Sequence, residues 1–432
     1  MAMDAPFTAA SAADNLVLES LEEFKVATKC YRDPEIFRQE MDLIFSKGWV
    51  FLAHESEVSS PGDFKSCWVG KQSVILTRDP DCRLHAFINA CPHRGATLCR
   101  AERGNVAAFV CPYHAWSFKI SGELVGIADR SRYPADFPVV DKGLKPIARL
   151  AEYHGLIFGS LDADAPEFAD YIGPAAKHVE LWRARALGGK YRAGTPHRYL
   201  YRGNWKFQCE NVLDGYHANP VHGSAYRTIR QFPERFPGAD SSRAITGVRK
   251  TGEARGYPNG HGMLGAGAAL ETGNIPDDVR QRYQDQLIDR HGAQVAQEIV
   301  NNRHLLIFPN VCVMDNNLRV IQPIAHDLTE VYSYPMFIED AEPEINAARL
   351  GDVQARVGTA GIVNLDDIEI FNANQTAIGA PGLEYVTLSR GLGKEEVHPD
   401  GERVGHHSDE TPQRAFWRFW QQRMSAGSAA RA

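Results

Sequence analysis

The sequence predicts an α+β fold, with a small antiparallel β domain placed before a larger domain that combines an antiparallel sheet with helices. In residues 50–162, short apolar runs such as SVILTR, LHAFIN and HGLIFGSL are separated by Gly, Pro and Asp, which is typical of antiparallel strands. The remainder of the chain mixes helical patterns with strand-like runs. The helical patterns lie at 276–300 and 411–424, and the strand-like runs at 304–314 and 318–325. A chain of 432 residues is long enough for two or three domains.

The first predicted element is a helix within residues 33–48. Asp33 suits the N-cap, Pro34 suits the first turn, and Gly48 is a helix stop. An apolar stripe lies between these ends, at Phe37, Met41, Ile44 and Phe45. We therefore predict that residues 1–48 form an N-terminal helical segment that packs on the larger domain. Further along the chain, the glycine-rich stretch at 255–273 predicts a mobile loop.

The composition excludes several classes of protein. The chain is 44% hydrophobic and 23% charged, and its net charge of -7 argues against nucleic acid or an anionic membrane as the main partner. No apolar run approaches the roughly 18 residues that span a bilayer, and the N-terminus MAMDAPFTAASAADN lacks the features of a signal peptide. Eight widely scattered cysteines predict reduced thiols, some of them metal ligands. We expect a soluble, cytoplasmic protein.

Two loops of the β domain carry a cysteine and a histidine each. Residues 91–95 read CPHRG and residues 111–116 read CPYHAW. A tetrahedral zinc site is one reading of two cysteines with two histidines. Zinc sites usually pair like ligands locally, however, whereas a Rieske [2Fe-2S] cluster binds one iron through two cysteines and the other through two histidines. The pattern therefore predicts that Cys91 and Cys111 bind one iron and that His93 and His114 bind the other.

A second set of candidate ligands lies in residues 209–222, which read CENVLDGYHANPVH. His217 and His222 are five residues apart and would diverge on a regular helix, so we expect Asn219-Pro220 to break the helix between them. Two histidines and a carboxylate around open positions form the metal site of non-haem Fe(II) oxygenases. A pair of purely structural histidines is the alternative. An iron–sulfur electron donor in the same chain favours the iron site, since oxygen activation needs electrons.

With these motifs the chain resembles the α subunits of Rieske-type aromatic-ring-hydroxylating oxygenases over nearly its whole length. CPHRG and CPYHAW match the family's cluster motif, and NWKFQCENVLDGYHANPVH matches its iron motif. The resemblance implies a Rieske domain at 49–163 and a catalytic mononuclear iron domain at 164–432. It also implies a third iron ligand in GTAGIVNLDDIEIF, for which we choose Asp367, with Asp366 as the rival. Asn211 and Tyr216 match the motif and are expected to support the site.

The resemblance further implies a homotrimer, with or without small β subunits (α3 or α3β3). In the family, the cluster of one subunit lies close to the iron of its neighbour. An aspartate at the position of Asp214 then bridges the cluster histidine of the adjacent subunit, which corresponds to His114, and the first iron histidine, His217. From the residues alone, Asp214 and His217 are three apart and would share a helix face. A carboxylate in this place would fix the orientation of the histidine; an ordinary helix-surface acid is the alternative.

Electrons are expected from a separate NADH-dependent reductase, in some relatives through a ferredoxin. Residues 260–265, GHGMLG, satisfy the G-x-G-x-x-G pattern of dinucleotide-binding proteins. The pattern must follow a buried strand and open a helix, and here it follows GYPN and precedes more glycine. We therefore do not expect this chain to bind NADH.

For the substrate, the spelling of the iron motif and of LLIFPNVCVMDNNLRVIQPI is similar to the benzoate, anthranilate and cumate branch. Arg319 is a candidate for binding an aromatic carboxylate, and a surface or structural arginine is the alternative. We expect an oxygenase that uses O2 to hydroxylate an aromatic ring, most simply by cis-dihydroxylation of an aromatic acid. Monohydroxylation, demethylation and dioxygenation of a neutral aromatic use the same metals. A Rieske electron carrier and a zinc-stabilised binding protein are alternatives from other classes.

Overall fold

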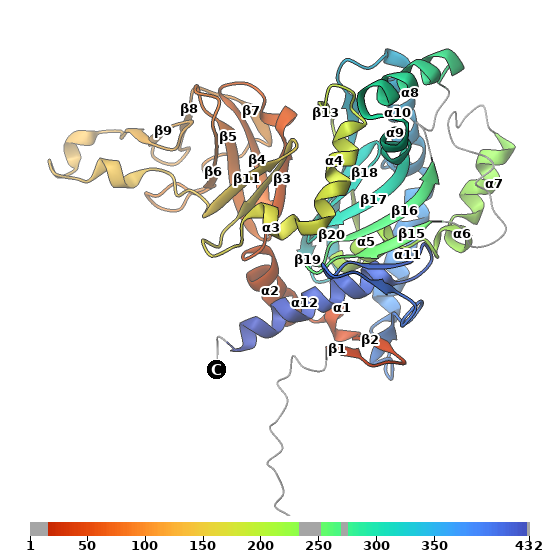
Figure 1. Ribbon diagram of the computed structural model, residues 1–432. Coiled ribbons are helices and arrows are strands. Elements are labelled where there is room, and N and C mark those ends of the chain that lie inside the picture. Colours follow the sequence, from red (N-terminus) through yellow and green to blue (C-terminus); the bar gives the residue numbers. More distant parts are fainter. Residues whose placement is uncertain (1–15, 233–251, 269–274, 430–432) are drawn as a thin grey trace, which may run out of the picture.

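The computed structural model describes residues 16–232, 252–268 and 275–429. Figure 1 shows a smaller lobe of strands beside a larger lobe in which helices surround one extended sheet. In the described part, no helix is both long and apolar enough to span a membrane.

Three small antiparallel sheets build the smaller lobe. A four-stranded sheet has the order β6-β5-β4-β7, and two three-stranded sheets have the orders β10-β9-β8 and β11-β12-β3. The strands are β3 (Val50–His54), β4 (Asp63–Val69), β5 (Gln72–Arg78), β6 (Leu84–Ile88), β7 (Arg103–Asn105), β8 (Ala108–Val110), β9 (Ser117–Lys119), β10 (Leu124–Gly126), β11 (Arg149–Tyr153) and β12 (Leu156–Ser160). Loops and 3-10 turns connect them, and the longest connection is residues 127–148 between β10 and β11.

The larger lobe contains a ten-stranded sheet, in the order β13-β20-β19-β18-β17-β16-β15-β23-β22, with β14 also paired to β20. Its strands are β13 (Tyr191–Ala193), β14 (His197–Tyr201), β15 (Glu253–Gly256), β16 (Gly262–Ala268), β17 (Asn301–Ile307), β18 (Val311–Met314), β19 (Asn317–Ala325), β20 (Leu328–Ile338), β22 (Glu396–Val397) and β23 (Arg403–His406). All of the pairings in this sheet are antiparallel. The predicted α+β fold is confirmed.

Helices cover both faces of this sheet. They are α3 (Phe168–Ile172), α4 (Ala176–Ala184), α5 (Trp205–Val212), α6 (Ala218–Val221), α7 (Gly223–Gln231), α8 (Asp277–His291), α9 (Ala293–Ile299), α10 (Pro343–Asp352), α11 (Ile362–Ala377) and α12 (Thr411–Ala429). Along the central strands, alternate side chains belong to two different hydrophobic clusters. One cluster includes residues of α4, α8 and α9, and the other includes residues of α5, α11 and α12.

The N-terminal segment differs in part from its prediction. Asp33 caps α2 (Pro34–Glu40) by accepting a hydrogen bond from the backbone N–H of Glu35, as expected, and a π-helix (Met41–Phe45) continues it. Before it lie α1 (Lys29–Arg32) and two strands, β1 (Val17–Glu19) and β2 (Phe24–Ala27). The two strands pair with each other, and β2 also pairs with β21 (Tyr385–Thr387). The prediction of a purely helical segment was therefore wrong for this part, because the apolar residues of VLE and FKVA are used in strands.

Other element boundaries also need correction. The stretch at 255–273 is not one loop, because β15 and β16 form a hairpin there; residues 269–273 lie outside the described residues. The hairpin also removes the strand-then-helix context that a dinucleotide site needs. The helix expected at 276–300 is two helices, separated at Gly292 with a φ of +78°. The run at 304–314 is two strands, because Pro309 lies in the turn between them.

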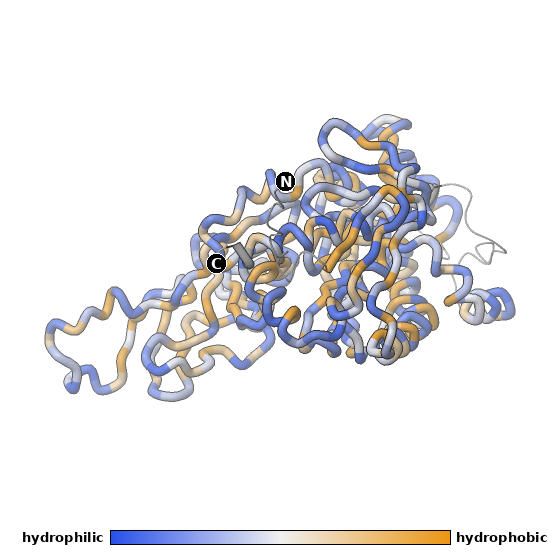
Figure 2. Tube along the Cα trace, turned by 90° about the horizontal axis from the view of Figure 1, so that it is seen from below, coloured by the Kyte–Doolittle hydropathy of each residue, from blue (hydrophilic) through white to orange (hydrophobic). Residues whose placement is uncertain are grey.

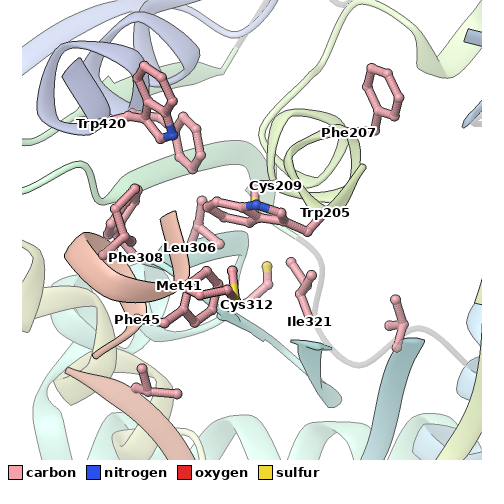
Figure 3. Packing of buried hydrophobic residues seen from close by; sticks show 14 of the residues in the cluster. Met41, Phe45, Trp205, Phe207, Cys209, Leu306, Phe308, Cys312, Ile321 and Trp420 are labelled. Atoms are coloured by element: carbon pink, nitrogen blue, oxygen red, sulfur yellow. The ribbon is translucent and has the colours of Figure 1, made fainter. Parts of the chain in front are cut away.

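A cluster of buried hydrophobic residues joins the N-terminal segment to the larger lobe. Figure 3 shows Met41 and Phe45 beside Trp205 of α5, with Trp420 of α12 on another side. The rings of Phe45 and Trp205 meet edge to face, with 5.2 Å between their centroids. Figure 2 shows the hydrophobic stretches concentrated inside the larger lobe and the hydrophilic ones towards its periphery. This packing fixes the first turn of α5 against the N-terminal segment.

One buried ion pair lies within this apolar cluster. The ammonium of Lys206 is 2.5 Å from Oε1 of Glu40, and both side chains are fully buried. The indole N–H groups of Trp205 and Trp420 donate to the two oxygens of Glu40, each at 2.8 Å. A buried carboxylate is tolerated only when such donors replace its water.

We expect Trp420→Phe to lower the free energy of unfolding by about 2 kcal/mol, because a hydrogen bond to a buried charge is lost. Chemical denaturation followed by circular dichroism measures it. Trp182→Phe is the matched control, since Trp182 is also buried but its indole N–H has no hydrogen-bond partner among the described residues. Equal losses in the two variants would show that ring packing, and not the bond to Glu40, accounts for the effect.

Candidate metal centres

The two cysteine–histidine loops of the smaller lobe have the same backbone geometry. The N–H of Cys91 donates to the carbonyl of Ala96 at 2.8 Å, and the N–H of Gly95 donates to the carbonyl of Cys91 at 2.9 Å. The second loop has the same two bonds. The N–H of Cys111 donates to the carbonyl of Trp116 at 2.8 Å, and the N–H of Ala115 donates to the carbonyl of Cys111 at 3.0 Å. Gly95 and Ala115 both have positive φ, of +73° and +56°. Each sequence thus folds into a tight turn that presents a thiol and an imidazole.

The structure brings the four predicted cluster ligands together. Cys91 and Cys111 are buried, and the rings of His93 and His114 lie 4.6 Å apart. Nδ1 of His114 is buried and has no hydrogen-bond partner among the described residues. An unpartnered ring nitrogen is costly unless a ligand uses its lone pair. Two buried thiols and two neighbouring imidazoles fit the donor set of a Rieske cluster.

Helix α5 leads into the second site. Asn204 caps it by accepting a hydrogen bond from the backbone N–H of Lys206, and α5 ends at Val212. The turn that follows is held by Asp214, whose Oδ1 accepts hydrogen bonds from the backbone N–H groups of Tyr216 at 2.5 Å and His217 at 3.1 Å. Asp214 and His217 are therefore neighbours through a turn, and the expectation that they share a helix face was wrong.

The helix between the two histidines also differs from its prediction. We expected Asn219-Pro220 to break a helix. Instead they lie inside α6, a single helical turn that follows His217. Proline is tolerated in a first turn because its missing N–H has no helical partner there. The chain bends instead at His222, with φ −92° and ψ 17°, before α7 begins. The two rings converge because each histidine flanks this short helix.

Two imidazoles and one carboxylate meet at one point. Nε2 of His217 and Nε2 of His222 lie 3.3 Å apart. Oδ1 of Asp367, on α11, lies 3.6 Å from the first nitrogen and 3.3 Å from the second. Ligand atoms from these three residues all lie within 4.8 Å of one another, close enough to share a metal ion. Burial alone would lower the pKa of His217, but the nearby carboxylates raise it overall, whereas burial lowers the pKa of His222.

Asp366, the alternative to Asp367 as the third ligand, lies on the opposite side of the His222 ring. Its Oδ2 is 3.4 Å from Nδ1 of His222, so it faces the nitrogen that points away from the three converging atoms. Adjacent residues of a helix diverge by about 100°, which allows the two acids to contact opposite edges of one imidazole. The sequence did not reveal this role, because the identity of the partner depends on the orientation of α11 against α6.

Asn211 and Tyr216 contact different partners. The amide nitrogen of Asn211 lies 3.0 Å from Oδ1 of Asp367 and 3.2 Å from Nε2 of His217, so it touches the converging group directly. Tyr216 is half exposed, and its ring packs under the guanidinium of Arg390, 4.0 Å from the ring centroid. It contributes to the site through its backbone bond to Asp214.

Asp214 lies between the converging group and the surface. Its Oδ2 is 3.7 Å from Nδ1 of His217, and its side chain is 31% exposed. Burial raises the pKa of Asp214, but contacts with His217 and with two backbone N–H groups lower it overall, so the carboxylate stays ionised. Figure 1 places the turn between β8 and β9 on the side of the smaller lobe remote from α5 and α6. The two candidate sites of one chain are therefore far apart.

A cavity of about 220 Å³ opens beside the converging histidines. Asn211, His217, His222 and Asp367 line one part of it, and Arg319, His304 and Met314 from the sheet line another. Arg319 is 3% exposed, and its Nε has no hydrogen-bond partner within residues 16–232, 252–268 and 275–429. Among the described residues, no carboxylate lies within ion-pair distance of its guanidinium. This burial excludes a surface arginine, whereas a structural arginine and an arginine that binds substrate both fit it.

The comparisons with known proteins agree with this geometry. A family model for the Rieske [2Fe-2S] domain matches residues 48–141, and one for the ring hydroxylating alpha subunit (catalytic domain) matches residues 188–426. Toluate 1,2-dioxygenase subunit alpha of Pseudomonas putida is 33% identical over 390 residues, which are 88% of this chain and 84% of that protein. The 2-halobenzoate 1,2-dioxygenase large subunit of Burkholderia cepacia is 34% identical over 377 residues, which are 85% of this chain and 80% of that protein.

A solved structure of naphthalene 1,2-dioxygenase with indole bound in the active site superposes with a TM-score of 0.84. It is 28% identical, and the match covers 95% of this chain and 94% of that one. These relatives confirm the expected cofactors, a Rieske [2Fe-2S] cluster and a mononuclear iron, and exclude a bare electron carrier or a zinc protein. The chain belongs to the alpha subunits of the Rieske-type ring-hydroxylating dioxygenases, as the two family models, the relatives and the fold together show.

Proposed function

We propose that this chain is the catalytic subunit of a terminal oxygenase that cis-dihydroxylates an aromatic carboxylic acid. The observation that carries the proposal is Arg319, a buried cation in the cavity that His217 and Asp367 also line, with no carboxylate partner in the described part of the chain. A buried charge is costly unless it is paired, so an anionic substrate would complete the site. Both benzoate-type relatives act on aromatic acids by name, which supports the same choice.

In this proposal His217, His222 and Asp367 hold the iron. Iron in such a site supplies the activation of O2, since three protein ligands leave positions open for oxygen beside the substrate. Asn211 holds Asp367 by its amide, and Asp366 holds the far nitrogen of His222, so both ligands keep their orientation. Cys91, Cys111, His93 and His114 hold the cluster.

Electrons would come from an NADH-dependent reductase, directly or through a ferredoxin. The separation of the two sites in Figure 1 favours transfer between neighbouring subunits of a homotrimer, either α3 or α3β3. Asp214 suits the bridging position, because it contacts His217 on one side and is partly exposed on the other. We propose that it also accepts a hydrogen bond from His114 of the adjacent subunit.

Arg319 is positioned by the register of the sheet. It lies opposite Cys312, with β18 and β19 paired, and both side chains face α5. A guanidinium forms two parallel hydrogen bonds with a carboxylate, so it fixes the direction of the ring as well as its charge. The ring would then lie in the cavity between Arg319 and the metal ligands.

We expect Arg319→Met to raise KM for benzoic acids about ten- to hundred-fold, because hydrogen bonds between charged groups contribute about 1.5–3 kcal/mol. The KM for a neutral aromatic such as indole should change little. Steady-state oxygen uptake with a generic reductase and NADH measures both. Arg319→Lys is the matched control, since it keeps the charge but loses the two parallel hydrogen bonds. Its KM for benzoic acids should lie between those of the natural enzyme and Arg319→Met. Equal effects on acids and neutral compounds would remove the proposed anchor.

Dioxygenation of a neutral aromatic is the second candidate, favoured by the structural match to naphthalene 1,2-dioxygenase. The two candidates are separated by screening aromatic acids, amines and hydrocarbons and weighing the products by mass spectrometry. A cis-dihydrodiol gains two oxygens and two hydrogens, whereas a monohydroxylated product gains one oxygen. Turnover of hydrocarbons with no turnover of acids would overturn the proposal.

A further inference from the structure

His304 faces the cavity from the middle of the sheet. It lies on β17 opposite Met314 of β18, and Arg319 lies opposite Cys312 of the same strand. Side chains two residues apart on a strand share a face, so His304 and Arg319 project from the same side of the sheet, with β18 between them. Both line the cavity that contains the metal ligands.

The hydrogen bonding of His304 fixes its tautomer. Nδ1 lies 3.2 Å from the carbonyl oxygen of Val212, at the end of α5. A carbonyl only accepts, so Nδ1 carries the proton and Nε2 has a free lone pair in the neutral ring. Among the described residues Nε2 has no hydrogen-bond partner. Burial, assisted by the charge of Arg319, lowers the pKa of His304 to about 3, which keeps the ring neutral.

Arg319 and His304 are therefore two unlike groups among the polar side chains that line the cavity beside the metal ligands. Arg319 offers only donors, and His304 offers one acceptor. The side chains of Met314 and Leu264 that line the same cavity are apolar, so they leave this acceptor unsatisfied. A benzoic acid without further polar groups would satisfy Arg319 and leave Nε2 of His304 unpaired.

We propose that Nε2 of His304 accepts a hydrogen bond from an amino or hydroxyl substituent on the ring of the bound acid, which makes His304 a specificity-determining residue. The inference rests on the proposed function, since it takes the carboxylate to bind Arg319. The substrate class then narrows to benzoic acids that carry an N–H or O–H donor.

The test uses the intact holoenzyme, with both metal centres loaded, and measures Kd anaerobically so that ring reactivity plays no part. At ring positions 2 and 3, each amino- and hydroxybenzoate is compared with the methylbenzoate of similar shape. We expect at least one donor acid to bind about three- to ten-fold more tightly than its methyl partner, as one net hydrogen bond allows. His304→Leu should abolish this preference and leave the Kd of benzoate itself nearly unchanged.

His304→Gln is the conservative variant, because an amide offers an N–H for the carbonyl of Val212 and an oxygen for the substrate. It should retain part of the preference, and the cluster spectrum and iron content report that each variant is folded. No donor preference in the natural enzyme, or the same preference in His304→Leu, overturns the inference. A Kd for benzoate that does not change in Arg319→Met would instead refute the proposed function, so the two failures are distinguishable.

Discussion

Alanine at His217 or at Asp367 should remove the mononuclear iron and leave the iron–sulfur cluster intact. Each residue supplies one of the three ligand atoms that converge in the described structure, and the remaining two would hold a ferrous ion weakly. Turnover should fall by about 1,000-fold or more, since the metal contributes several kcal/mol to catalysis. The measurements are iron and inorganic sulfide per chain, the visible spectrum of the cluster, and oxygen uptake with substrate.

Helix α11 supplies the controls for this experiment. Glu369→Gln changes an exposed acid two residues beyond Asp367 and should keep both metals and full activity. Asp366→Ala should weaken iron binding by about 10- to 100-fold without abolishing it, because it frees the far nitrogen of His222. Loss of sulfide from the His217 or Asp367 variant would contradict the ligand assignment. Greater loss of iron in Asp366→Ala than in Asp367→Ala would exchange the roles of the two acids.

Asp214→Ala should leave both metal centres in place but slow electron transfer between them on the order of 100-fold. The carboxylate holds the turn before His217 and is proposed to contact the adjacent subunit, so its loss interrupts the path without removing a ligand. Stopped-flow absorbance of the pre-reduced enzyme, mixed with substrate and O2, would follow oxidation of the cluster.

Asp214→Asn is the informative companion variant. An amide oxygen still accepts the backbone N–H bonds of Tyr216 and His217, so the turn should persist while the negative charge is lost. Slow oxidation of the cluster in both variants would assign the effect to the lost charge. Slow oxidation in Asp214→Ala alone would assign it to the lost turn. A normal rate in Asp214→Ala would refute the bridge altogether.

Local patterns predicted the fold class and the ligand motifs well, because they depend on short segments. CPHRG and CPYHAW form matching turns, and Asp33 caps its helix. Pairing between strands that are distant in the sequence was harder to predict. The glycines at 256–265 suggested a loop, but the partners β17 and β23 recruit this segment into the sheet as β15 and β16. Likewise, Pro220 signalled a helix break that the first turn of α6 does not need.

The site shows the same division. His217 and His222 could be singled out from one motif, whereas the contact between His222 and Asp366 depends on where α11 lies in the folded chain. His304 was not singled out, although its alternation with Leu306 in HLLIF was a usable signal for the inner face of a strand. The individual ligand roles and the domain boundaries at 48/49 and 163/164 stay predictions.

Helix α11 also fastens the start of α5. Oδ1 of Asn372 accepts the backbone N–H of Arg202, and Oε1 of Gln375 accepts that of Asn204, each at 2.9 Å. The helix that carries the carboxylate ligand is thus clamped to the segment leading to the histidines, although about 150 positions of chain separate them. These two bonds do not involve β17 or β19. Substitutions in the cavity wall that keep the bond between His304 and Val212 can therefore change the fit of the aromatic compound while the start of α5 stays attached to α11.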